Sequence, residues 1–146
     1  MLKKIFLTIV IIALQSGCEE RSKTDVAEVH WDRDMCARCV MVVSDRHNSV
    51  QVREPKTGKT YIFDDIGCMV LWFKKNNFPW QKQATIWVND VETGQWIDAK
   101  TAIYTSGNTT PMAFGFSAHK SKESLKKEEK ALTFEEISKR ILERKR

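Results

Sequence analysis

The stretch FDDIGCMVLWFKK, residues 63–75, indicates how the chain folds. An aspartate near its start can accept hydrogen bonds from unpaired backbone N–H groups, and lysines at its far end complement the helix dipole. Ile66, Met69, Val70 and Phe73 recur at helical spacing on one face. The stretch therefore predicts an amphipathic helix.

A similar pattern returns near the C-terminus. FEEI at residues 134–137 matches FDDI at residues 63–66, and the two lie 71 residues apart. Met41 and Met112 are separated by the same 71 residues, and each lies in a hydrophobic, strand-like run. Two matches at one offset suggest a duplicated strand–strand–helix unit. Packing such halves together would bring the two methionines to a common cleft.

The remaining elements are predicted from local composition. Runs rich in β-branched and aromatic residues predict strands at residues 40–43, 50–52, 59–63, 84–88, 96–97 and 102–104, the first two forming a hairpin. Residues 119–130 are charged and are expected to be partly helical. Thr133 and Glu136 form a capping box that opens a last helix to about Glu143.

The N-terminus has the features of an export signal. Two lysines precede an apolar run at residues 5–14, which is shorter than the roughly 20 residues that span a bilayer. QSGC at residues 15–18 resembles the lipobox of bacterial lipoproteins, which predicts a signal peptide at residues 1–17 and a lipid on Cys18. An ordinary secretory signal is the alternative. Either signal places the chain outside the cytoplasm, and the lipid would anchor it to a membrane at the periplasmic face or the cell surface.

Charge and composition divide the rest of the chain. Residues 18–35 are polar and lack apolar periodicity, which predicts a tether. Residues 36–118 are expected to form the α+β body. Residues 119–146 carry ten basic and six acidic residues and would complete the second unit. This basic tail is interpreted as a solvated helix face, because nucleic acid is not an expected partner outside the cytoplasm.

The stretch CARCVM, residues 36–41, places three soft sulfur ligands within six residues. Copper(I) accepts both thiolate and thioether, whereas thioether suits few other metals. Met112 lies in TPMAFGF, residues 110–116, a second turn-like stretch. We expect the two stretches to meet and hold one copper(I) ion. The alternative is that Met41 packs in the core, where flexible methionine fills gaps.

The number of cysteines also favours ligand chemistry. If Cys18 carries lipid, three cysteines remain, so at least one thiol is left without a disulfide partner. Cys68 lies in the first turn of the predicted helix, where the dipole can lower a thiol pKa, although packing is the favoured role for a buried cysteine. His119 follows a predicted strand and is a candidate nitrogen ligand.

These motifs resemble the NosL family, the copper-chaperone lipoproteins associated with nitrous oxide reductase. CARCVM, FDDIGCM at residues 63–69 and TPMAFGF occur in the family's order, downstream of the cysteine expected to carry lipid. The resemblance implies an α+β fold of two ββαβ-like units packed as one small domain, similar to the organomercurial lyase fold. Val40 and Ala113 stand where the family has glycine.

The resemblance also implies a function and partners. The chain would bind copper(I) and deliver it to nitrous oxide reductase, working with that enzyme's maturation and ABC-transporter machinery, and would not itself be an enzyme. We expect Cys39 and Met41 from the first unit and Met112 from the second to hold the ion, with Cys36 as an auxiliary thiolate. Further candidate ligands are Cys68, Met69 and His119.

Two other functions fit the cysteine pair. Cys36 and Cys39 could be the redox pair of a thiol–disulfide oxidoreductase, but a thioredoxin-like pair opens a helix and Cys39 leads into a strand-like run. A structural zinc site could use Cys36, Cys39, Cys68 and a histidine, although such sites usually show two cysteine pairs.

Overall fold

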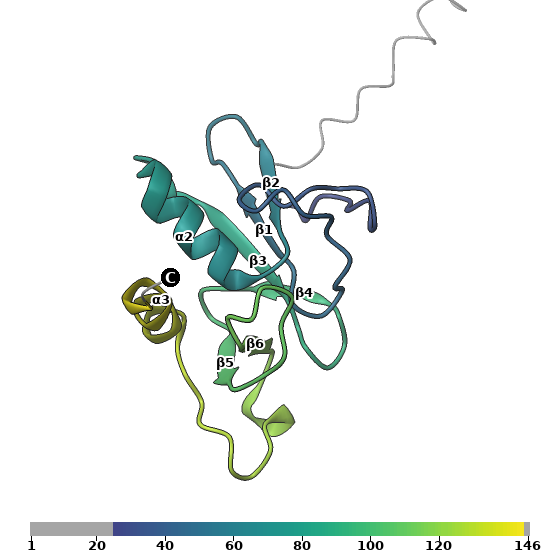
Figure 1. The fold of residues 1–146 in the computed structure, drawn as a ribbon, viewed down its shortest axis with the longest axis vertical. Helices are drawn as coiled ribbons and strands as arrows, with labels where there is room; N and C mark the ends of the chain where they lie inside the picture. Colours follow the sequence, from purple (N-terminus) through teal and green to yellow (C-terminus); the bar gives the residue numbers. More distant parts are fainter. Residues whose placement is uncertain (1–24, 145–146) are drawn as a thin grey trace, which may run out of the picture.

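Residues 25–144 are described by the computed structural model (Figure 1). The predicted signal peptide and Cys18 lie outside these residues. Among the residues described, no helix combines the length and the apolar character that crossing a bilayer requires.

A four-stranded antiparallel sheet forms the larger layer of the domain. Its strands lie in the order β2-β1-β3-β4, and a second sheet pairs β5 with β6. The strands are β1 (Val50–Arg53), β2 (Thr60–Phe63), β3 (Thr85–Asn89), β4 (Trp96–Asp98), β5 (Ile103–Ser106) and β6 (Phe116–His119). Every residue of β1 is buried, so both faces of the sheet are covered at its centre.

Residues 25–35, assigned from the sequence to the tether, pack against this sheet. The side chain of Gln51 in β1 exchanges hydrogen bonds of 3.1 and 3.0 Å with the backbone of Ala27. The ring of Trp31 stacks on that of Trp96, with centroids 6.2 Å apart. The folded body therefore begins before residue 36, because contacts to the sheet hold a stretch that has no periodicity of its own.

The predicted hairpin of residues 40–43 and 50–52 is wrong. β1 pairs instead with β2 on one side and β3 on the other, with Val50 opposite Phe63 and Val88. Of residues 40–43, Val42 makes one isolated bridge, to Met35. The physical reason is the backbone of Val40, whose φ of 60° is incompatible with an extended strand.

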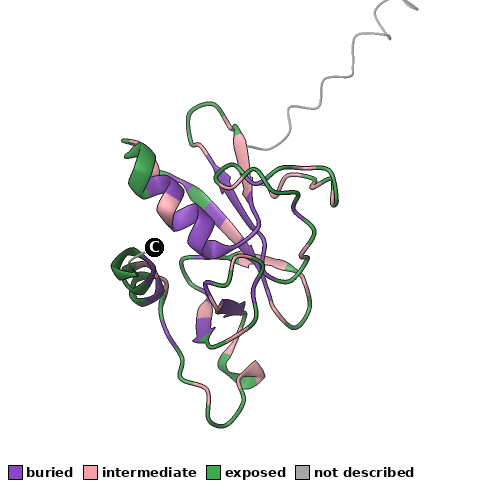
Figure 2. Cartoon of the chain, viewed as in Figure 1, coloured by how far each residue is buried: buried purple, intermediate pink, exposed green. Residues whose placement is uncertain are grey.

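The amphipathic helix is confirmed as α2 (Ile66–Asn76). Asp65 caps its start by accepting a hydrogen bond from the Gly67 N–H, and Asn77 ends it in the left-handed conformation. Figure 2 shows that the buried face of α2 is turned toward the larger sheet. Trp72 on this helix lies within an aromatic cluster, with its ring centroid 4.7–5.2 Å from those of Tyr61, Phe63, Phe73 and Phe78.

The predicted capping box opens α3 (Phe134–Glu143), where Thr133 and Glu136 each bond the other's backbone N–H. Ile137 and Ile141 are buried, and α3 packs beside α2 (Figure 1). Residues 119–130 contain only one short 3-10 helix, η2 (Lys122–Ser124). The expected helical content there is limited to that turn, because closely spaced charges leave no apolar face to bury.

These elements confirm the α+β fold class. β1, β2, α2 and β3 form a ββαβ unit, and β5, β6 and α3 follow in the order ββα. Leu132, just before α3, bridges to Tyr104 in β5. A parallel bridge between Asp90 and Ala118 joins the end of β3 to β6, so the two units pack as one domain.

Candidate metal centre

Three free thiols meet at the start of α2. The Sγ atoms of Cys36, Cys39 and Cys68 all lie within 4.8 Å of one another. Cys36 and Cys68 are buried, whereas Cys39 is partly exposed. We call these three residues the thiol cluster. Sulfur atoms at this separation can bind one soft metal ion together.

A tight turn places two of the three thiols. Cys36 donates its N–H to the Met41 carbonyl at 2.8 Å, and Val40 donates its N–H to the Cys36 carbonyl at 3.0 Å. The N–H of Ala37 binds the Ile62 carbonyl at 2.9 Å, which docks the turn on the end of β2. Val40 closes the turn with its φ of 60°, a conformation that favours glycine.

The third thiol comes from α2. Cys68 lies in the first turn of the helix, and its N–H bonds the Asp65 carbonyl at 2.9 Å. Sequence reasoning favoured packing for Cys68, but the structure brings its Sγ to the cysteine pair. The order of elements could have predicted this position of Cys68. β2 leads directly into α2, so a turn that docks on the end of β2 also lies beside the first turn of the helix.

The pKa values of the three thiols are shifted in different directions. A hydrogen bond from the Cys68 thiol and three from backbone N–H groups lower the pKa of Cys36 to about 4, against burial, which raises it. The same hydrogen bond and burial raise the pKa of Cys68. Burial raises the pKa of Cys39 as well. The neighbouring N–H and S–H donors therefore favour loss of a proton at Cys36 over loss of a proton at Cys39 or Cys68.

Two charged side chains border the thiol cluster. Arg38 Nη1 lies 3.8 Å from Cys68 Sγ and donates to it. Asp64 is buried, and its pKa is raised to about 6 by burial first and then by the negative charge on Cys36. Three thiolates that bind one monovalent ion keep a net negative charge. The guanidinium of Arg38 lies where it can offset part of that charge.

The loop of Met112 is tied to the same helix start. The carboxylate of Asp65 accepts hydrogen bonds from the Thr110 hydroxyl at 2.6 Å and from the Met112 N–H at 3.2 Å. It also caps α2 through Gly67, so one buried carboxylate joins the second loop to the helix that carries Cys68. Each of the two motif stretches therefore contacts the first turn of α2 or its cap, CARCVM through Cys68 and the Met112 loop through Asp65.

Phe114 and Arg144 secure that loop further. The ring of Phe114 lies directly over Gly67, where any added Cβ would collide with it. Arg144 Nη1 donates to the Phe114 carbonyl at 2.7 Å, and its guanidinium lies 5.1 Å from the ring centroid of Phe116. The residue after α3 therefore helps to hold the Met112 loop.

The two methionines differ in exposure. Met41 is 51% exposed, so the interpretation of Met41 as a core residue is wrong. Met112 is partly buried and packs against the core. Each is next to a residue in the left-handed conformation, Val40 with φ 60° and Ala113 with φ 55°. The glycine-type backbone that the resemblance implies is thus kept at both positions although neither residue is glycine.

Met69 and His119 lie elsewhere. Met69 is fully buried and lines a cavity between α2 and α3. His119 bonds through both ring nitrogens, to Thr105 Oγ1 at 3.0 Å and to Ser124 Oγ at 3.1 Å, within the second unit. The one group of potential histidine, cysteine and carboxylate ligands found in the described part of the chain consists of the three cysteines alone, without His119.

Comparisons with known proteins support the resemblance. The sequence model of a family described as NosL matches residues 28–140. Among solved structures, the fold is similar to that of the copper chaperone NosL from Shewanella denitrificans, with a TM-score of 0.57 and 14% sequence identity. That similarity covers 67% of this chain and 81% of the other. A search of curated proteins found no match.

Proposed function

Because the chain belongs to the NosL family, we propose that it binds copper(I) outside the cytoplasm and delivers it to a copper enzyme, nitrous oxide reductase, during assembly of that enzyme. The observation that carries the proposal is the thiol cluster, three free sulfur atoms within 4.8 Å of one another at the junction of two motif loops. Copper(I) is the cargo in this proposal, and the chain catalyses no reaction.

The proposed ligand set includes Cys68, which was among the further candidates from the sequence, as a full ligand. Cys36 and Cys39 supply thiolates from one turn, and Cys68 joins them as a third thiolate, since all three sulfur atoms lie within 4.8 Å of one another. Met41 and Met112 remain proposed thioether ligands, because the turn of Met41 and the loop of Met112 each contact the start of α2, through Cys68 and Asp65 respectively. The exposure of Met41 suits transfer of the copper ion to a partner protein. A ligand of the partner can approach the ion from this exposed side and replace the neutral thioether of Met41.

The electrostatics fit a monovalent soft cation. Metal binding must displace the protons held on Cys39 and Cys68, whose pKa values are raised. Arg38 then stabilises the remaining negative charge, because its guanidinium lies beside Cys68. Such a site binds metal less tightly in acid, where protons compete for the thiolates.

We further propose that Cys18 carries a lipid that keeps the chain at a membrane surface, close to the transporter machinery. The support is the sequence QSGC after a short apolar run. Replacing Cys18 with alanine should abolish incorporation of labelled palmitate. A mature chain that begins elsewhere, without lipid, would contradict this part of the proposal and leave the copper site untouched.

A thiol–disulfide oxidoreductase is the second candidate, favoured by the lowered pKa of Cys36. Against it, Cys36 is buried, and the cysteine pair lies in a turn and does not open a helix. Assaying the reduced protein for catalytic reduction of a protein disulfide distinguishes the two. Turnover above that of free dithiol, lost in Cys36→Ser, would favour the enzyme.

The decisive test of copper binding is an anaerobic titration of the reduced protein with copper(I) against a competing chromophoric chelator. We expect one equivalent to bind, and Cys39→Ser or Cys68→Ser to lower the affinity by more than about tenfold, or about 1.4 kcal/mol. Zinc(II) should not displace copper(I). Unchanged affinity in both variants, or preferential zinc binding, would contradict the proposed site.

A further inference from the structure

We propose that the cavity between α2 and α3 binds a free single-chain carboxylate amphiphile, a ligand with an aliphatic body and one anionic group. This interhelical cavity has a volume of about 440 Å³. It is lined by α2, α3, β3 and the short 3-10 helix η1 (Gln81–Gln83), and it is separate from the thiol cluster.

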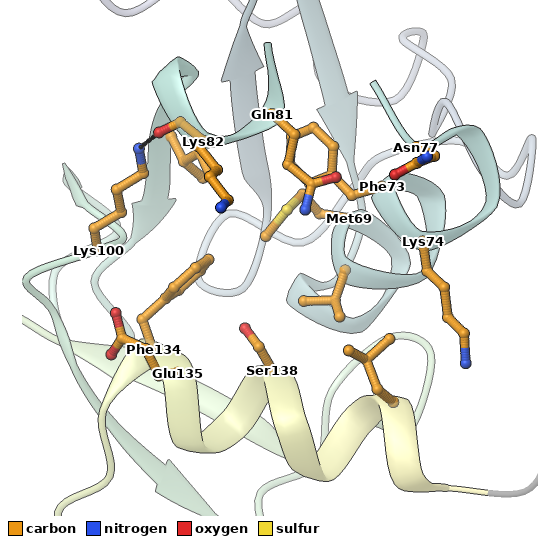
Figure 3. A pocket seen from close by; sticks show the side chains of 13 residues that line it. Met69, Phe73, Lys74, Asn77, Gln81, Lys82, Lys100, Phe134, Glu135 and Ser138 are labelled. Carbon is orange, nitrogen blue, oxygen red and sulfur yellow. Dashed lines mark hydrogen bonds between the residues drawn. The ribbon is translucent and has the colours of Figure 1, made fainter. Parts of the chain in front are cut away.

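The body of the cavity is apolar. Met69 and Phe73 from α2, Ile86 from β3, and Phe134 and Leu142 from α3 line it. Figure 3 shows the Met69 sulfur and the Phe134 ring turned toward the same central space. Such a lining favours a hydrocarbon chain, because burying it removes apolar surface from water.

A few polar groups converge on this apolar space. The Ser138 hydroxyl is buried and has no hydrogen-bond partner among the described residues. In Figure 3 it points from α3 into the cavity, opposite the amide of Gln81 and the ammonium of Lys82. A buried hydroxyl without a partner carries a free-energy cost, which a ligand oxygen would remove.

The side chains at the rim of the cavity carry a net positive charge, which favours an anionic ligand over a cationic one. Lys74, Lys82 and Lys100 line the cavity against a single carboxylate, that of Glu135. The Lys100 ammonium donates to the carbonyls of Lys82 and Ala84 at 3.1 and 2.7 Å, which fixes it at the rim. The excess positive charge complements a carboxylate and would oppose a cationic head group.

The volume favours one chain. Small-molecule cavities in proteins are roughly 300–1,000 Å³, and this one lies toward the lower end. A two-chain phospholipid would leave most of its hydrocarbon outside. The volume therefore suits a free single-chain amphiphile, and binding of a membrane lipid is the alternative that the experiment distinguishes.

The test uses calorimetric titration with decanoate. The protein begins at residue 18 and carries Cys18→Ser, so it retains every residue that the structure describes and needs no detergent. We expect decanoate to bind with a Kd below about 100 μM. Decyltrimethylammonium, which has the same chain and the opposite charge, should not bind. The titration is carried out without copper and repeated after copper(I) has been added. The test of decanoate binding therefore remains valid even if the protein does not bind copper(I).

Three variants locate the site. Lys82→Met keeps the length of the side chain but removes its charge, and should weaken decanoate binding about tenfold. Ser138→Leu fills the cavity and should abolish binding. Lys139→Met is the matched control, because Lys139 is exposed on α3, forms an ion pair with Glu143 and does not line the cavity. It should bind decanoate as the parent does.

Several outcomes would overturn the proposal: no binding of decanoate to the parent protein, equal binding of the cationic amphiphile, or equal binding of decanoate by the parent and the Lys82→Met variant. Vesicles of phosphatidylglycerol provide the last arm. If Lys82→Met and Ser138→Leu weaken binding to these vesicles and free decanoate does not bind, the cavity recognises a membrane lipid, and the free carboxylate is wrong.

Discussion

The carboxylate of Asp65 accepts the hydroxyl hydrogen of Thr110 at 2.6 Å, across 45 residues of sequence. Both side chains are buried, and Asp65 also caps α2. This contact links the first turn of α2, which carries Cys68, to the loop that carries Met112. Asp65 is therefore one of the groups that set the position of the Met112 loop relative to Cys68.

Thr110→Val tests that link. The substitution keeps the shape of the side chain and leaves one buried oxygen of Asp65 without its hydroxyl donor, so the free energy of unfolding should fall by about 1–3 kcal/mol. Copper(I) affinity should fall as well, because the Met112 loop loses an anchor. Chemical denaturation and chelator competition measure the two effects. Thr57→Val is the control, because its hydroxyl bonds Glu54 at an exposed site, and it should change neither quantity.

Val40→Gly should stabilise the protein. Val40 has a φ of 60° and is 68% exposed, so glycine relieves strain while little packing is lost. A left-handed conformation costs an L-residue about 1–2 kcal/mol, and the free energy of unfolding should rise by up to that amount. Val42→Gly is the matched control. Val42 is also exposed but lies outside the left-handed region, so glycine there should destabilise. A loss of stability in Val40→Gly as large as in Val42→Gly would contradict the strain.

Met41→Leu and Met112→Leu should each lower copper(I) affinity. Leucine keeps approximate volume and apolarity but removes the sulfur, so the free energy of unfolding should change by less than about 1.5 kcal/mol. Met35→Leu is the control, because Met35 is also exposed and lies in the same segment, one residue before the CARCVM motif. Parent-like affinity in both variants would remove the thioethers from the proposed ligand set and leave the three thiolates.

Asp64→Asn should change how stability depends on pH in the reduced, metal-free protein. Burial raises the pKa of Asp64 from 3.8 to about 6, so the folded state holds this proton more tightly than the unfolded state does. The stability contributed by Asp64 is therefore present below about pH 4 and is lost as pH rises toward 6. At pH 7 the variant should be more stable than the parent, on the order of 1 kcal/mol, and at pH 4 the two should agree. Denaturation curves at several pH values measure this, and a difference that does not vary between pH 4 and 7 would contradict it.

Local sequence signals predicted the helices well. The Asp65 cap, the apolar face of α2 and the capping box at Thr133 each depend on residues within one or two turns, so sequence spacing was sufficient. The strand predicted at residues 40–43 was wrong because tertiary contacts, and not local residues, determine the backbone there. Valine-rich composition favours extended backbone, but the turn that brings Cys36 and Cys39 together requires a left-handed residue at Val40, and this tertiary requirement overrides propensity.

The candidate site could be predicted only in part. The pairing of Cys36 with Cys39 followed from motif spacing, whereas the meeting of Met41 with Met112 that the repeat suggests stays a prediction. The role of Cys68 could not be derived in this way, because its sulfur joins the pair through docking of a turn on the end of β2. The placement of residues 25–35 depends in the same way on partners such as Gln51 and Trp96.

Arg144 binds the carbonyl of Phe114, a residue made 30 positions earlier in the chain. During synthesis the Met112 loop therefore lacks this anchor until α3 and Arg144 have been made. The position of this loop should therefore be fixed late, after both sheets have formed. A nascent or proteolytically shortened chain that ends before Arg144 would contain both sheets and both helices and would lack the side chain that ties the Phe114 carbonyl to the end of α3.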